Sequence, residues 1–84
     1  MQTVMFNFKS EVPAQMQAAR LEDIASWDAI TVTAFLDAEA SLPELRRMCY
    51  AYVQEAADID GVLKCLIALP EIETAFIPAQ RYLL

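Results

Sequence analysis

The chain has 84 residues, of which 57% are hydrophobic and 21% charged, and its 12 acidic and 6 basic residues give a formal net charge of −6. This length and composition are typical of one small globular domain with a hydrophobic core and exclude a disordered chain. A phosphate-binding surface needs clustered Lys and Arg. Only Arg46 and Arg47 are adjacent here, so we expect neither a nucleic acid nor an anionic membrane surface as a partner.

No apolar run approaches the roughly 20 residues that a membrane-spanning helix needs. Residues 1–10 show no basic leader followed by an apolar block, so we expect no secretion signal. The two cysteines, Cys49 and Cys65, are too few for a disulfide scaffold. We therefore expect reduced thiols in a cytoplasmic protein.

The first half of the chain predicts a strand, a helix and a second strand. Residues 3–9 alternate between two faces, with Val4, Phe6 and Phe8 on one of them. Pro13 suits the first turn of a helix, which should reach about residue 27. Its apolar side is expected to contain Ala14, Ala18, Leu21, Ile24 and Ala25. Residues 30–36 are β-branched and alternating, which predicts a strand with Ile30, Val32 and Ala34 on one face and Thr31, Thr33 and Phe35 on the other.

The second half predicts a strand, a helix and a short last strand. Residues 37–44 are polar and contain a proline, so we expect a connection there. Residues 47–53 alternate, with Cys49, Ala51 and Val53 on one face and Met48, Tyr50 and Tyr52 on the other. Asp58 is a good N-cap for a helix that Pro70 ends. Its apolar stripe is expected to contain Ile59, Val62, Leu63, Leu66 and Leu69.

The chain ends in a short strand and a tail. Residues 74–77 form the last predicted strand, and Pro78 indicates that it lies at a sheet edge. Residues 79–84 have no capping or periodic signal. We therefore expect one domain over residues 1–78 and a C-terminal tail over residues 79–84.

Two β-α-β units in this order normally interleave, which predicts an α+β, ferredoxin-like βαββαβ fold. Its four-stranded antiparallel sheet would have the first and third strands in the centre and both helices on one face. The face under the helices would carry small side chains, namely Ala34, Cys49, Ala51 and Ala75. The opposite face would be open and would present Met5, Phe35, Met48, Tyr50, Tyr52 and Phe76.

Large apolar side chains on an uncovered face indicate a surface for a partner or for self-association. The alternative is that Tyr and Phe are there only because they are good strand formers.

The residues that catalysis or metal binding would need are mostly missing. There is no His, and the cysteines are not in a CxxC motif. A single Gly excludes the usual phosphate-cradling loop. Asp58 and Asp60 are better explained by capping and solvation of a helix N-terminus than by a catalytic pair. We therefore expect a non-enzymatic protein without catalytic residues, metal or cofactor.

One family resemblance adds to this interpretation. The strand Tyr50-Ala51-Tyr52-Val53, the helix over residues 58–69 and the run Leu69-Pro70-Glu71-Ile72-Glu73-Thr74-Ala75-Phe76-Ile77-Pro78 resemble the second half of subtilisin-type protease propeptides and their free-standing inhibitor relatives. Residues 3–9 resemble the first strand of that family.

The resemblance implies that the open sheet face lies on two helices of a protease and that the tail lies in the substrate cleft. The residues in those places would be Met48, Tyr50, Tyr52 and Phe76 on the sheet, and Tyr82, Leu83 and Leu84 in the cleft. The leading hypothesis is an inhibitor or folding chaperone that acts in trans on a subtilisin-like serine protease. The alternative is a ferredoxin-like regulatory or small-molecule-binding module that homodimerises through the same face.

Overall fold

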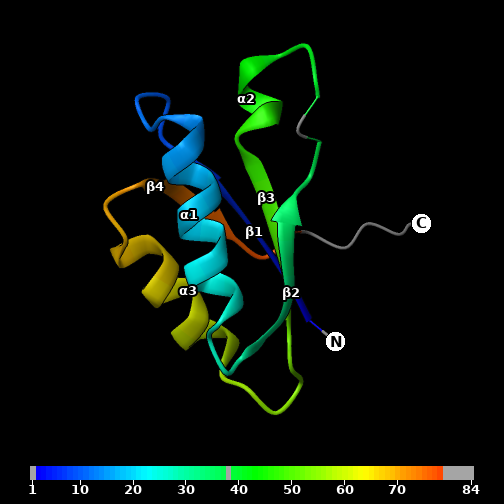
Figure 1. Cartoon of the computed structure of the whole chain (residues 1–84). Helices are drawn as coiled ribbons and strands as arrows, with labels where there is room; N and C mark the ends of the chain where they lie inside the picture. Colours follow the sequence, from blue (N-terminus) through cyan, green and yellow to red (C-terminus); the bar gives the residue numbers. More distant parts are fainter. Residues whose placement is uncertain (1, 38, 79–84) are drawn as a thin grey trace, which may run out of the picture.

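The computed structural model describes residues 2–37 and 39–78, which form one sheet and three helices (Figure 1). In chain order the elements are β1 (Gln2–Phe8), α1 (Ala14–Ala25), β2 (Ile30–Phe35), α2 (Pro43–Arg46), β3 (Met48–Val53), α3 (Ile59–Ala68) and β4 (Ile72–Phe76). No helix within these residues has the length and apolar composition needed to cross a membrane.

The four strands form one antiparallel sheet in the order β2-β3-β1-β4. β1 and β3 are therefore the central strands, and β4 is at an edge, as its following proline predicts. Helices α1 and α3 both lie on one face of the sheet (Figure 1). The predicted α+β class, with four antiparallel strands and two helices on one face, is confirmed. The short α2 is added between β2 and β3, where the sequence predicts only a connection.

The core lies between the sheet and these two helices. The alternation predicted for the central strands is confirmed, because every second residue of β1 and of β3 is fully buried. Leu21 and Ile24 of α1 and Val62 and Leu66 of α3 pack onto them. The buried strand residues are Val4, Phe6, Phe8, Ile30, Cys49, Ala51, Val53 and Ile72.

The side of α1 that faces the sheet differs from the expected one. Gln17, Leu21 and Ile24 are buried, whereas Ala18 and Ala25 are exposed. Gln17 is tolerated because its Nε2 donates a hydrogen bond to the Val12 carbonyl at 2.9 Å. The expectation failed because three small alanines were given the same weight as larger apolar side chains.

The register of β2 against β3 shifts between Ile30 and Val32. Ile30 pairs with Val53 and Val32 with Tyr52, so Thr31 is the extra residue of a β-bulge. A shift of one residue moves each following side chain to the opposite face. Ala34 consequently pairs with Tyr50 on the open face, and Phe35 pairs with Cys49 on the face that the helices cover. The faces expected for Ala34 and Phe35 are both wrong for this reason.

Candidate functional site

The side of the sheet opposite α1 and α3 has no helix on it within the described residues, and we call it the open sheet face (Figure 1). Strand registers place ten residues on it: Thr3, Met5, Asn7, Val32, Ala34, Met48, Tyr50, Tyr52, Thr74 and Phe76.

A row of apolar side chains crosses all four strands of this face. Ala34 pairs with Tyr50, Tyr50 with Met5, and Met5 with Phe76. Directly paired residues of antiparallel strands have Cβ atoms only about 5 Å apart, so the four side chains are neighbours. The row is therefore one continuous strip across the sheet, built from segments far apart in the sequence.

Tyrosines add to this strip on β3. The rings of Tyr50 and Tyr52 have centroids 5.2 Å apart and are tilted by 49°. Tyr52 pairs with Val32 on one side and Thr3 on the other. Both Tyr52 and Phe76 are exposed to solvent, so the face presents large apolar side chains to water.

The open sheet face is also almost free of charge. None of its ten residues is an Asp, Glu, Lys, Arg or His. At its margin, the Asn7 Nδ2 donates a hydrogen bond to Glu73 Oε1 at 3.4 Å. The Thr74 hydroxyl donates to Asn7 Oδ1 beside it. In a chain of net charge −6, an uncharged strip is a departure from the rest of the surface.

The structure places the residues predicted to bind a partner as follows. Met48, Tyr50, Tyr52 and Phe76 lie on the open sheet face, as expected. Phe35 does not, since its ring packs against Phe8 at a centroid distance of 6.4 Å on the helix side. The remaining members of the predicted set, Tyr82, Leu83 and Leu84, lie outside the described residues.

Three further apolar members of the open sheet face, Met5, Val32 and Ala34, were not included among the predicted binding residues. Met5 was expected on this face, and its place in the row follows from the β1 alternation. Val32 and Ala34 were assigned to the opposite face because the bulge at Thr31 gives no signal in a β-branched run.

The described residues offer little for catalysis. Cys49 is fully buried, and burial raises the pKa of its thiol to about 12, so it is protonated and unreactive at neutral pH. Cys65 is exposed on α3. Within residues 2–37 and 39–78 no three His, Cys, Asp or Glu side chains are grouped as a metal site would require.

Comparisons with protein-family models, with curated proteins and with solved structures gave no match.

Proposed function

We propose that this protein is a non-enzymatic binding module whose docking surface is the open sheet face. The observation that carries the proposal is the uncovered apolar row Ala34, Tyr50, Met5 and Phe76, which crosses all four strands. Tyrosine is among the residue types that dominate the energetics of protein interfaces. The burial and protonation of Cys49 support a role without thiol chemistry.

The proposed partner is a subtilisin-like serine protease, which the chain inhibits or helps to fold. The sequence resemblance suggests this partner, and one feature of the fold supports it. Phe76 ends the apolar row on edge strand β4, and residues 79–84 follow Pro78 directly. Six extended residues span at most about 20 Å. A partner seated on the row would thus have residues 79–84 within reach of an adjacent cleft, where an extended peptide gains affinity from backbone pairing.

The proposal includes a cytoplasmic location. Its support is the state of the two cysteines, Cys49 and Cys65, which are both free. Unpaired thiols are the usual condition in a reducing compartment.

The second candidate is a homodimer built on the same face, acting as a regulatory or small-molecule-binding module. The lack of charge on the open sheet face favours it. Two copies each carry a net charge of −6 and repel one another least where the contact surface is neutral. A two-fold interface also needs a patch that is complementary to itself, and a strip of rings and methyl groups meets that condition.

Deletion of residues 82–84 distinguishes the two candidates. The intact and truncated chains are titrated against several subtilisin-type proteases, and the mass of each chain in solution is measured by light scattering across a concentration series. The protease proposal expects inhibition by the intact chain only, with the stability of the domain changed by less than about 1 kcal/mol. The dimer proposal expects no inhibition by either chain and the same concentration-dependent mass for both.

Tyr50→Asp is the matched variant on the sheet, because it places a charge in the middle of the row. It should abolish protease binding or dimerisation, whichever occurs, in a domain that stays folded. If a monomeric intact chain neither inhibits any of the proteases nor raises their yield on refolding, both proposals are wrong.

A further inference from the structure

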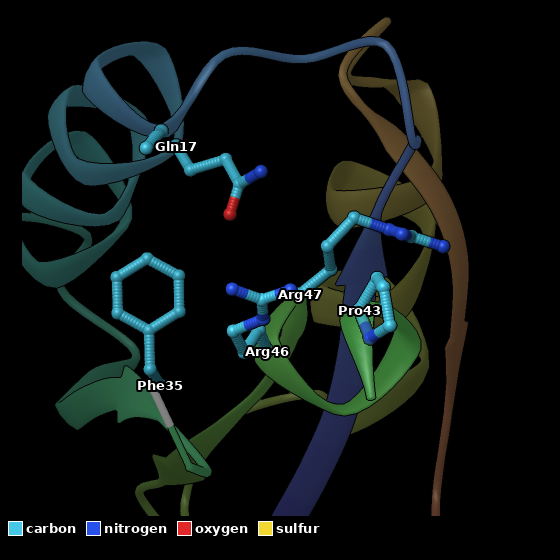
Figure 2. Close-up of a pocket in the computed structure, with 6 residues that line it drawn as sticks. Gln17, Phe35, Pro43, Arg46 and Arg47 are labelled. Carbon is cyan, nitrogen blue, oxygen red and sulfur yellow. The ribbon is translucent and has the colours of Figure 1, made fainter. Parts of the chain in front are cut away.

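A cleft of about 390 Å³ lies on the helix side of the sheet, away from the open sheet face (Figure 2). Its walls are the start of α1, the end of β2 and the short α2. The residues that line it are Ala14, Gln17, Phe35, Pro43, Arg46 and Arg47. This volume is within the range of about 300–1,000 Å³ that is typical of small-molecule sites.

Two arginines at one cleft are notable in an acidic chain, since they are a third of its 6 basic residues. The Arg46 side chain has no hydrogen-bond or ion-pair partner among the residues that the structure describes. Arg47 is anchored, because its Nε donates to the Phe8 carbonyl at 3.1 Å. Its anchoring leaves its terminal amino groups without a partner in the described part of the chain. The free guanidinium of the cleft is therefore that of Arg46, whereas the Arg47 side chain is directed away from it, toward β1 (Figure 2).

Gln17 supplies a hydrogen-bond acceptor, whereas the arginines supply donors. Its side chain is 8% exposed, and its Nε2 is used by the Val12 carbonyl. The amide oxygen is directed into the cleft, on the side of Arg46 and Phe35 (Figure 2). A nearly buried acceptor in this position fits a ligand that carries an N–H or O–H group.

The rest of the lining is apolar. The Phe35 ring packs against the Phe8 ring, and Pro43 and Ala14 complete the apolar lining. A guanidinium binds a carboxylate with two parallel hydrogen bonds, whereas an apolar wall favours an organic ligand over an inorganic ion.

We propose that this cleft binds a small organic carboxylate that has an apolar group and a hydroxyl or amino donor. Arg46 holds the carboxylate, the Gln17 amide oxygen accepts from the donor, and Phe35 contacts the apolar group. The site shares no residue with the open sheet face, so it does not depend on the proposed docking function.

The test uses mandelate as the probe, because it combines a carboxylate, a hydroxyl and a phenyl ring. Amide chemical shifts of the full-length, isotope-labelled chain are followed during titration with mandelate. A ligand of this size should bind with a dissociation constant on the order of a few millimolar. Mandelamide, phenylacetate and inorganic phosphate are titrated in parallel, since they lack the charge, the hydroxyl and the apolar group respectively.

The expected result is saturable binding of mandelate with shifts around the cleft. Mandelamide and phosphate should bind at least tenfold more weakly, and phenylacetate severalfold more weakly. Arg46→Gln should weaken mandelate at least tenfold. Lys64→Gln, which removes one positive charge from exposed α3, should leave mandelate binding unchanged, as should Tyr50→Asp.

Any of three results overturns the proposal. One is the absence of saturable shifts with mandelate up to 50 mM. Another is equal binding of mandelate and mandelamide, which would show that the charge is not recognised. The third is equal binding by the wild-type chain and Arg46→Gln. Because Arg46 is exposed, this variant should keep the amide spectrum of a folded domain, which the same experiment verifies.

Discussion

A pair of aspartate substitutions at two positions of β3, Tyr50 and Val53, tests which side of the sheet is open. Tyr50 faces the uncovered side, whereas Val53 is fully buried under the helices. We expect Tyr50→Asp to leave the domain folded and Val53→Asp to unfold it. The two changes introduce the same carboxylate into the same strand, so strand propensity alone predicts no such contrast.

The magnitudes follow from the surroundings of each residue. Val53→Asp removes a buried side chain that contributes about 1.5–3 kcal/mol and adds the penalty of an unpaired buried carboxylate, which is several kcal/mol. The free energy of unfolding of a domain of this size is about 4–13 kcal/mol. Tyr50→Asp loses the ring contact with Tyr52, which is about 0.5–1.5 kcal/mol, and up to about 1 kcal/mol of strand propensity. Only the cost of Val53→Asp is comparable with the whole free energy of unfolding.

Urea unfolding followed by circular dichroism, together with the amide spectrum of each variant, measures both outcomes. Tyr50→Thr serves as a control, because it removes the ring without adding a charge and keeps a good strand former. Unfolding of both aspartate variants, or a Val53→Asp variant as stable as Tyr50→Asp, would refute the assignment of the two faces.

Three further predictions concern stability and reactivity. A thiol reagent should label only Cys65 in the native chain, because Cys49 is buried with a pKa of about 12; labelling of both thiols without denaturant would contradict this. Replacing both cysteines with Ala should preserve partner binding and lower the free energy of unfolding by roughly 1 kcal/mol. Hydrogen bonds from Arg20 lower the pKa of Glu71 below its ordinary 4.5. The stability that they contribute should be complete above about pH 4.5 and lost as the pH falls through the lower pKa of the folded state. Urea midpoints measured over an acidic pH series should therefore fall less steeply for Glu71→Gln than for the wild type. Gly61→Ala should raise the free energy of unfolding by about 0.5–1 kcal/mol, since Gly61 is inside α3. The nearest atom to the new methyl group is the Asp58 Oδ2, 3.1 Å away, at the end of an exposed side chain that can shift. A lower urea midpoint would show that the Asp58 carboxylate does not shift.

The regular central strands explain why so much of the fold could be predicted from the sequence. β1 and β3 bury every second residue, and both have partners on two sides, so their faces follow from periodicity alone. The stripe of α3 is equally clear, since Val62 and Leu66 lie at its centre and are buried. Asp58 is at the expected N-cap position, but its side chain makes no capping hydrogen bond. Periodicity predicts where an element begins more reliably than it predicts the geometry of a single side chain.

The cleft could not be predicted in the same way, because its residues are polar or scattered. Gln17 interrupts the apolar side of α1. It is accommodated because its Nε2 donates a hydrogen bond to the Val12 carbonyl. Arg46 and Arg47 are visible in the sequence as a pair, yet what they line depends on how α2 stands over the end of β2. Such placement depends on tertiary contacts that no local pattern encodes.

The bulge at Thr31 affects both the open sheet face and the cleft. In the run Ile30-Thr31-Val32-Thr33, β-branched residues fit either face of a sheet, so the sequence carries no local mark of where the register shifts. In a regular strand, Phe35 would stand on the open sheet face and Ala34 under the helices. The extra residue exchanges the two faces, so the small Ala34 side chain ends the apolar row. The Phe35 ring instead packs on Phe8 and forms a wall of the cleft. One inserted residue on an edge strand thus decides the shape of the docking surface and the presence of an aromatic wall in the cleft behind it.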